Sequence, residues 1–384
     1  MGYVLISFLS WLILRFLVLR PFPCGRPVKT VLSCLFFLPF FYYTYLQTSC
    51  FIVLPEPAFW AGILMGAWCG TVLIAAPFAS AGVLCIRYSG RKGVLQRRGV
   101  GACLFFSLLF SSSLVLCGLR EGLSVPSVQE VSVNLPAGCD ALDGIRMAVI
   151  SDLHLGCATP PGWLEKTLRR IKEARADIIL LDGDLSDGRP DDRRPDLARL
   201  GTLEAPLGVW AVPGNHEYYV DYAGIMAALP DSVHVLANSH VKLRTLRGTF
   251  VLAGVTDRKA RARGLPGPDI EKALSGLSGD KSSGPVILMS HRPAGWSRNA
   301  THGVVLQICG HTHGGQFIWN RPFLMLIGRR YLHGLFERNS SLLWVGSGAS
   351  QWFGCPLRVG VPPEIAVLNL HAGSRAQKKS GEVQ

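Results

Sequence analysis

Acidic side chains are nearly absent from the first third of this 384-residue chain. Residues 1–121 contain ten Lys and Arg residues but only two acids, Glu56 and Glu121. The remainder contains 29 basic and 24 acidic residues, an ordinary balance for a soluble domain. The formal net charge of +13 at pH 7 therefore comes largely from the N-terminal third. Since the remainder has no basic stripe interleaved with aromatic residues, we expect no nucleic-acid partner.

Zinc-finger spacing is also missing. Seven of the eleven cysteines lie between Cys24 and Cys117, and the others are Cys139, Cys157, Cys309 and Cys355. None of them forms a CxxC or Cys/His finger pattern, which argues against a structural zinc site. We interpret most of them as small apolar side chains that are buried or face lipid.

The first apolar segment, residues 3–19, has no basic region before it and no small-residue cleavage site after it. This pattern argues against a cleaved signal peptide. Three more apolar segments cover residues 31–54, 59–86 and 100–119. Because about 20 apolar residues span the hydrocarbon core of a bilayer, the sequence predicts about four membrane helices.

Two basic loops predict the orientation of these helices. The first contains Arg20, Arg26 and Lys29, and the second contains Arg87, Arg91, Lys92, Arg97 and Arg98. Two spans separate the loops, so both lie on one side, which the positive-inside rule assigns to the cytoplasm. We therefore predict a multi-pass membrane protein whose C-terminal domain lies on the non-cytoplasmic face. The sequons at Asn299 and Asn339 suit that location but add little support.

A soluble α/β pattern begins after the last apolar segment. Strand-like apolar runs occur at residues 147–150, 178–181, 209–212, 250–255, 286–290, 304–309, 342–345 and 365–370. Amphipathic segments at 162–174, 222–229 and 270–277 predict helices, so a mixed sheet structure with outer helices is expected. We divide the chain into a transmembrane region (1–121), a linker (122–144), an α/β domain (145–372) and a disordered tail (373–384).

Polar clusters follow five of the predicted strands directly. Asp152 and His154 follow the first, and two residues at positions i and i+2 of an extended segment point to one side. The later clusters contain Asp182, Asp184 and Asp187; Asn215, His216 and Glu217; His291; and His311 and His313. Residues at the carboxyl ends of strands converge on one edge of a sheet in open α/β folds.

The residue types in these clusters predict a metal centre. Asp, Asn and several His, with no Cys, suit Mn, Fe, Zn or Mg. The set is too large for one ion and suits two, with one carboxylate bridging them. Two ions roughly 3.5–4 Å apart stabilise both the attacking and the leaving oxygen of a displacement at phosphorus.

In this order, Asp-x-His, Gly-Asp, Gly-Asn-His-Glu, a lone His and Gly-His-x-His resemble the calcineurin-like metallophosphoesterase superfamily. The resemblance covers about residues 145–370, and residues 344–348 and 356–365 resemble its bacterial membrane-anchored branch. It implies a four-layer αββα sandwich that follows a multi-span α-helical membrane region. It also implies a metal-dependent hydrolase acting on phosphoric ester bonds.

The resemblance implies a role for each matching residue. Asp152, His154 and His313 would hold the first divalent cation, Asn215, His291 and His311 the second, and Asp184 would bridge them. His216 would contact the phosphate and protonate the leaving oxygen, and Glu217 would orient His216. A hydroxide that bridges the two ions would attack phosphorus.

Several residues near the motifs have an alternative interpretation. Asp182 and Asp187 flank Asp184 and are expected to cap turns rather than bind metal. His333 is expected to be a packing or surface residue, although its loop could reach the substrate. Arg292 and Arg358 could contact phosphate, but an Arg on a surface loop usually does not.

Two functions from different classes fit the sequence. The leading one is a membrane phosphoesterase that hydrolyses a phosphate mono- or diester. The alternative is a membrane scaffold or receptor that retains a structural metal site without turnover, although such a site needs no acid like His216. Nuclease activity is a third option, disfavoured because no basic stripe accompanies the motifs. A lipid-linked substrate is a hypothesis that rests on the membrane anchor alone.

Overall fold

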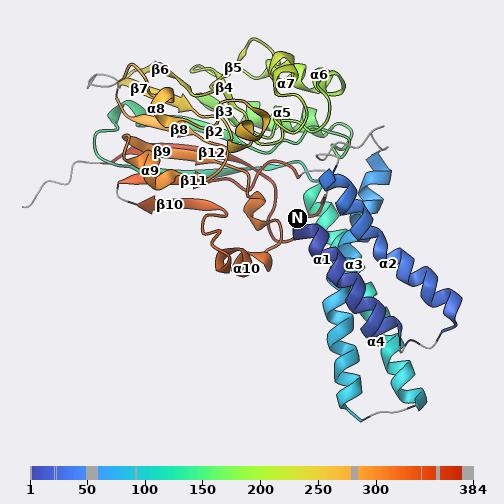
Figure 1. Cartoon of the computed structure of the whole chain (residues 1–384). Helices are drawn as coiled ribbons and strands as arrows, with labels where there is room; N and C mark the ends of the chain where they lie inside the picture. The colour runs from blue at the N-terminus through green and yellow to red at the C-terminus, as the bar shows by residue number, and fades with distance from the viewer. Residues whose placement is uncertain are drawn as a thin grey trace, which may run out of the picture. The chain divides into compact units, whose positions relative to one another are not determined.

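A computed structural model gives the fold of the chain (Figure 1). It describes residues 2–20, 22, 24–48, 59–90, 93–277, 284–338, 340–351 and 355–373. The chain forms two compact units. The helical unit comprises Met1–Ser124, Gly156–Pro160 and Gln351–Val359, and the sheet unit comprises Val125–Leu155, Pro161–Ser350 and Gly360–Gln384. The predicted disordered tail, beyond Gly373, lies outside the described residues.

Apolar helices build the helical unit. Helix α1 (Gly2–Ile13) continues into a π-helical segment, η1 (Leu14–Leu19), and is followed by α2 (Arg26–Thr48), α3 (Phe59–Tyr88) and α4 (Gly93–Gly122). Of these, α2, α3 and α4 are long and apolar enough to cross a membrane, whereas the stretch Val4–Leu19 is shorter. Three of the four expected segments thus form long apolar helices. Residues 49–54 of the second predicted span lie outside the described residues.

Four glycines on two helices make room for a loop of the same unit: Gly66 and Gly70 on α3, and Gly118 and Gly122 on α4. A Cβ atom at Gly70 would lie 2.4 Å from a methyl carbon of Leu357. The backbone N–H of Arg358 donates a hydrogen bond to the Gly118 carbonyl oxygen at 3.0 Å. Small residues spaced four apart let a backbone approach a membrane helix closely. The loop from residue 355 to 359 is therefore packed against α3 and α4.

Two six-stranded sheets build the sheet unit. The first has the order β1-β12-β2-β3-β4-β5 and the second β10-β11-β9-β8-β7-β6. The first contains β1 (Ser127–Leu135), β2 (Arg146–Ile150), β3 (Ile178–Asp182), β4 (Val209–Val212), β5 (Val233–Val235) and β12 (Glu364–Ala372). The second contains β6 (Ser239–Thr245), β7 (Gly248–Gly254), β8 (Val286–Met289), β9 (Val304–Cys309), β10 (Gly334–Arg338) and β11 (Ser341–Val345). Strands β2 to β5 run parallel, as do β7, β8, β9 and β11.

The two sheets pack face to face. Val149 and Leu180 of the first sheet share one buried core with Ile287 and Ile308 of the second. Side chains alternate along a strand, so the intervening residues face outward. On the first sheet they pack against α5 (Trp163–Glu173), α6 (Pro190–Ala198) and α7 (Tyr222–Ala228), and on the second against α8 (Ile270–Ala273) and α9 (Trp296–Ala300). The layer order is αββα, which confirms the expected fold class.

Four strands lack a counterpart among the predicted ones: β1, β5, β6 and β10. Strand β1 lies inside the segment expected to be a linker, residues 122–144, and pairs in parallel with β12 along its whole length. Its sequence alternates polar and apolar residues, and only Val133 and Leu135 are buried. An edge strand with one solvated face carries fewer apolar residues than a buried strand, so a search for apolar runs misses it.

Candidate metal centre

The predicted ligands lie where parallel strands end. The loop after β2 and the loop after β3 run side by side, because Asp152 N–H donates to Gly183 O at 3.0 Å and His154 N–H to Asp184 O at 2.9 Å. The loops after β4, β8 and β9 approach the same edge. Asp184 Oδ1 accepts a hydrogen bond from His216 N–H at 2.8 Å, and both carboxylate oxygens of Asp152 accept from His311 N–H. The carboxylates of two predicted ligands thus also accept hydrogen bonds from the backbones of neighbouring loops.

The backbone of this centre is strained. Five of the seven predicted ligands have positive φ angles, namely Asp152, His154, Asp184, His311 and His313, with φ between 41° and 68°. Non-glycine residues in the left-handed region each cost on the order of 1–3 kcal/mol and cluster at functional sites. The surrounding fold therefore holds these side chains in an orientation that the backbone alone disfavours.

Two glycines permit the close approach of the loops. A Cβ atom at Gly214 would lie 2.2 Å from Asp184 Oδ1. A Cβ atom at Gly310 would lie 2.5 Å from Asp152 Oδ2. Any larger residue would displace a carboxylate of the centre, so glycine is required at both positions.

The first cluster comprises Asp152, His154 and His313, with one potential ligand atom from each residue within 4.8 Å of the others. The Nε2 atoms of His154 and His313 face each other at 3.3 Å, and His313 Nε2 lies 3.5 Å from Asp152 Oδ1. His313 Nδ1 lies 3.2 Å from the carbonyl oxygen of Ser350 and His154 Nδ1 lies 3.1 Å from Asp187 Oδ1. Because these oxygens only accept, each Nδ1 carries the proton and each Nε2 presents a lone pair.

The second cluster comprises Asp184, His291 and His311, again with one ligand atom from each within 4.8 Å of the others. His291 Nδ1 donates to the carbonyl oxygen of Asp182 at 2.7 Å, which leaves its Nε2 facing Asp184 Oδ2 at 3.0 Å. Asp184 Oδ2 also lies 3.9 Å from His154 Nε2. Asp184 is therefore adjacent to ligands of both clusters.

Arg292 connects Asn215 to His311 of the second cluster by hydrogen bonds. One guanidinium nitrogen of Arg292 donates to Asn215 Oδ1 at 2.7 Å, and another donates to His311 Nε2. The Nε atom of Arg292 lies 2.5 Å from Asp257 Oδ2, and Asp257 is buried. A cation thus lies between two predicted ligands, Asn215 and His311, and a buried carboxylate holds it there.

His216 forms a third group of potential ligands with His154 and Asp184, and its pKa is raised. Burial alone would lower the pKa of His216, but the charges of Asp187 and Asp184 and a hydrogen bond to Asp187 raise it to about 9. Its Nδ1 atom lies 2.6 Å from Asp187 Oδ1, and its Nε2 atom lies 4.0 Å from Asp184 Oδ2. The Nε2–H group of the protonated ring is thus directed to the centre, as a proton donor requires.

Asp187, rather than Glu217, makes the hydrogen bond that orients the His216 ring. The Glu217 carboxylate instead accepts hydrogen bonds from the backbone N–H groups of Asp184, Leu185, Ser186 and Gly214. Glu217 therefore fixes the loops after β3 and β4, and its charge adds to the raised pKa of His216. Burial would raise the pKa of Asp187, but His154 and His216 hold it well below its usual range.

The donor set fits divalent cations. The imidazole lone pairs of His154 and His313 lie close to the carboxylates of Asp152 and Asp184, and His291 Nε2 lies 3.0 Å from Asp184 Oδ2. The lone pairs of His154 and His313 point at each other, which is unfavourable unless a positive charge lies between them. Nitrogen and oxygen ligands without sulfur suit Mn, Fe, Zn or Mg.

Sequence reasoning missed one residue of this site, Asp257, and did not find the roles of two that it named, Asp187 and Arg292. Asp187 was expected to cap a turn, and Asp257 belongs to no motif. The spacing in Asp184-x-x-Asp187 was the available signal, since a second carboxylate three residues later can reach a neighbouring His. Asp182 contacts His291 through its backbone carbonyl oxygen while its carboxylate is fully buried, and His333 pairs with Glu364 at 3.1 Å.

The chain is similar to proteins that are described as metallophosphoesterases. The family model described as calcineurin-like phosphoesterase matches residues 145–315. An uncharacterized metallophosphoesterase of Helicobacter pylori is 35% identical over 66% of this chain and 66% of its own length. One of Campylobacter jejuni is 30% identical over 68% of each chain. A zebrafish protein described as a transmembrane protein with metallophosphoesterase domain is 29% identical over 69% of this chain and 62% of its own. The matches thus span about two thirds of the length of these relatives.

Proposed function

The chain belongs to the calcineurin-like phosphoesterase family, and we propose that it is a multi-pass membrane enzyme that hydrolyses a phosphate mono- or diester. The proposal rests on one observation: imidazole nitrogens and two carboxylates lie close together, beside His216, whose pKa is raised. In this proposal Asp152, His154 and His313 hold one divalent cation and Asn215, His291 and His311 hold a second. Asp184 is the shared ligand, which its place beside both clusters supports.

Each part of the centre has a chemical task in this proposal. Two divalent cations, when bound, supply Lewis-acid activation of water and of the phosphoryl oxygens. Asp187 keeps the His216 ring oriented and protonated, and His216 donates its Nε2 proton to the leaving oxygen. Glu217 holds the two ligand loops together.

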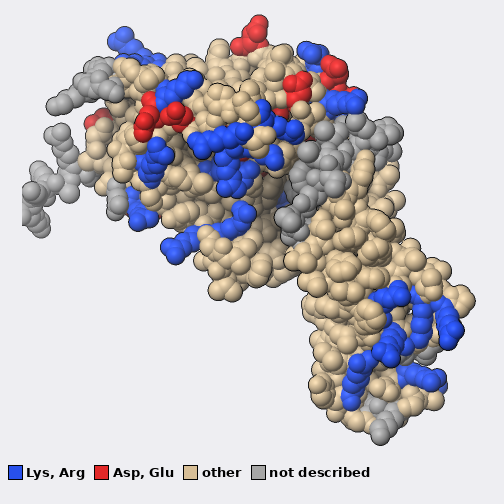
Figure 2. Space-filling view, in the orientation of Figure 1, with Lys and Arg blue, Asp and Glu red and all other residues tan. Residues whose placement is uncertain are grey.

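The three long apolar helices support membrane insertion. Figure 2 shows that the Lys and Arg side chains of the helical unit gather at one end of it. Residues at the start of α2, the end of α3 and the start of α4 supply basic groups there: Arg26, Lys29, Arg87, Arg97 and Arg98. By the positive-inside rule we propose that this end is cytoplasmic and that the sheet unit lies on the other face.

The test uses the full-length protein in detergent or lipid nanodiscs. Loaded with Mn²⁺, it should hydrolyse a chromogenic phosphodiester such as bis(p-nitrophenyl) phosphate. His216→Ala should reduce kcat by about 10²–10⁴-fold, the usual contribution of a general acid, with metal content unchanged. His302→Ala, which replaces a histidine outside the motifs, is the matched control. Full metal occupancy without any turnover would favour the scaffold or receptor alternative.

A further inference from the structure

A cavity of about 520 Å³ lies next to His311 in the sheet unit. Its lining contains five arginines and no carboxylate: Arg258, Arg292, Arg298, Arg329 and Arg330. Resting on the proposed function, we infer that this arginine groove binds a second phosphate of the substrate. The substrate would then be a phosphoester that carries another phosphate close to the scissile one.

The arginines come from four separate segments. Arg292 follows β8, Arg258 begins a short helix after β7, Arg298 lies in α9, and Arg329 and Arg330 follow helix α10 (Asn320–Leu326). Figure 2 shows Lys and Arg side chains gathered on the face of the sheet unit that carries α8 and α9. Because no segment contributes more than two of the five, the sequence contains no basic stripe. The fold creates the positive field, so the absence of a basic stripe in the sequence does not argue against an anionic substrate.

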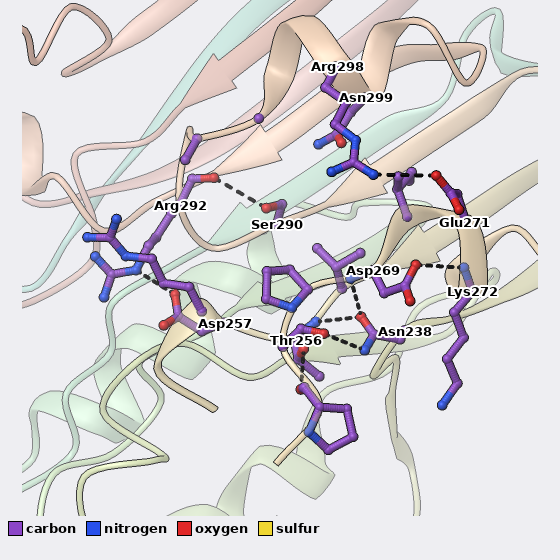
Figure 3. Close-up of a pocket in the computed structure, with 18 of the residues that line it drawn as sticks. Asn238, Thr256, Asp257, Asp269, Glu271, Lys272, Ser290, Arg292, Arg298 and Asn299 are labelled. Atoms are coloured by element: carbon purple, nitrogen blue, oxygen red, sulfur yellow. Dashed lines mark hydrogen bonds and ion pairs between the residues drawn. The ribbon is translucent and has the colours of Figure 1, made fainter. Parts of the chain in front are cut away.

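Most of these charges are available to a ligand. Among the described residues, no side-chain ion pair is found for Arg258, Arg329 or Arg330, and all three are exposed. Arg298 pairs with Glu271 at 3.4 Å, but both side chains are over 70% exposed, so the pair is weak. Figure 3 shows this pair and the Arg292–Asp257 pair on opposite sides of an adjoining cavity. Arginine forks bind phosphate oxygens in pairs, and an oriented set of them is specific for such groups.

Arg292 links the groove to the metal centre. Its guanidinium contacts His311 and Asn215, and Arg292 is also one of the residues that line the groove. His311, a predicted ligand of the second metal, also lines the groove, so a ligand in the groove lies beside the predicted second metal site. This places a bound anion beside the scissile phosphate rather than at it.

The segment that leads into the groove at Gly328 is apolar. Residues just before Arg329 expose large side chains, among them Phe323 at 60%, Leu326 at 84% and Ile327 at 56%. Apolar side chains followed by arginines suit the surface of an anionic bilayer. This arrangement favours a lipid headgroup as the source of the second phosphate, although a soluble phosphate shares the same chemistry.

Two chromogenic esters test the groove on the full-length, Mn²⁺-loaded protein. Ethyl p-nitrophenyl phosphate and 2-phosphoethyl p-nitrophenyl phosphate release the same leaving group and differ by one phosphate. The second should have a KM lower by about tenfold, and the advantage should shrink in high salt. Arg329→Gln/Arg330→Gln should abolish this advantage and leave kcat/KM for the ethyl ester within about twofold. Equal KM values for the two esters in the unmodified protein would overturn the inference.

A charge-matched control is available outside the groove. Arg169→Gln/Arg244→Gln removes the same charge from two exposed positions on α5 and β6. It should preserve the difference between the two esters. If it removes that difference as completely as the groove variant does, net charge and not the groove is responsible, and the inference fails.

Binding to metal-free protein separates the inference from the proposed function. After chelation, inorganic pyrophosphate should bind to the unmodified and control proteins and not to Arg329→Gln/Arg330→Gln, as measured by calorimetry. Binding without turnover of either ester would retain the groove and reject the proposed function. Turnover of both esters with equal KM, without pyrophosphate binding, would retain the proposed function and reject the groove.

Competition against the chromogenic ester distinguishes the two sources. One arm uses inorganic pyrophosphate, and the other uses phosphatidylcholine vesicles containing diacylglycerol pyrophosphate. Inhibition by either one supports the groove if Arg329→Gln/Arg330→Gln abolishes it. The stronger inhibitor shows whether a soluble phosphate or a lipid headgroup supplies the second phosphate. Inhibition by neither overturns the inference.

Discussion

At the scale of single residues, Asp187 couples a predicted metal ligand, His154, to the proposed acid, His216. One of its oxygens contacts Nδ1 of both His154 and His216, at 3.1 and 2.6 Å. Through the first contact it keeps a lone pair on Nε2 of His154, and through the second it helps to keep His216 protonated. A residue with two such tasks should affect metal binding and the pH profile together.

Asp187→Asn should therefore shift the alkaline limb of the kcat–pH profile. The acid acts when protonated, so activity is present below the pKa of His216 and lost as pH rises through it. Removing the Asp187 charge lowers that pKa, and the limb should move to lower pH by about one unit or more. The measurement is kcat against pH for the full-length protein, with Asp192→Asn as the surface control. An unmoved limb would show that Asp187 does not set the proton affinity of His216.

The position of Asp184 beside both clusters makes a separate prediction. Asp184→Asn should weaken both metal sites, each by more than the roughly tenfold expected for an outer partner. His154→Ala should mainly weaken the first site. Metal content after dialysis against graded chelator, measured by mass spectrometry, separates the two outcomes. Retention of both metals in Asp184→Asn would rule out a bridging role.

At the scale of elements, the helix glycines and the metal centre are connected through the chain. Ser350, whose carbonyl oxygen faces His313 Nδ1, immediately precedes the stretch Gln351–Val359 of the helical unit. A Cβ atom at Gly118 would lie only 3.0 Å from a methyl carbon of Val359. Displacing this stretch should therefore move the carbonyl group that orients His313.

Gly118→Leu should accordingly weaken metal binding by about tenfold, the usual effect of losing an outer partner of a ligand. Ser113→Leu, an exposed position on the same helix, is the control and should bind metal normally. Both variants are measured by metal titration in nanodiscs. Normal metal affinity in Gly118→Leu would show that the glycine does not position the loop.

The sequence predicts the buried strands and the ligands after them, because both can be recognised within a few residues. An apolar run indicates the strand, and Asp, Asn or His directly after it indicates the ligand. It predicts edge strands such as β1 poorly, because half of such a strand is solvated. It also misses features assembled by distant contacts. The partnership of Arg292 with Asp257 joins positions 35 residues apart, and the arginine groove joins four segments. No local pattern reports either arrangement.

At the scale of the whole molecule, the distribution of charge predicts an orientation in the membrane. An epitope inserted after Gly90 should be detected only after permeabilisation, and one inserted after Gly373 should be accessible from outside. Immunodetection on intact and permeabilised right-side-out vesicles makes the comparison. Accessibility of the Gly90 epitope in intact vesicles would reverse the proposed orientation.

Glycosylation is a poor reporter of that orientation. Asn299 is only 9% exposed, and its amide donates to Gln307 Oε1 at 2.9 Å. A glycan at Asn299 would have to break this buried contact, so we expect this sequon to remain unmodified on either face. The second sequon, at Asn339, lies outside the described residues.

The loop held by the helix glycines has a consequence for recombinant production. Deleting the first 124 residues is the obvious way to obtain a water-soluble fragment, but residues 156–160 and 355–359 would lose their packing partners. Ala158, Cys355 and Leu357, each 5% exposed or less in the whole chain, would then face solvent. Such a fragment should aggregate and bind metal poorly. Inactivity of a truncated preparation would therefore not count against the proposed function.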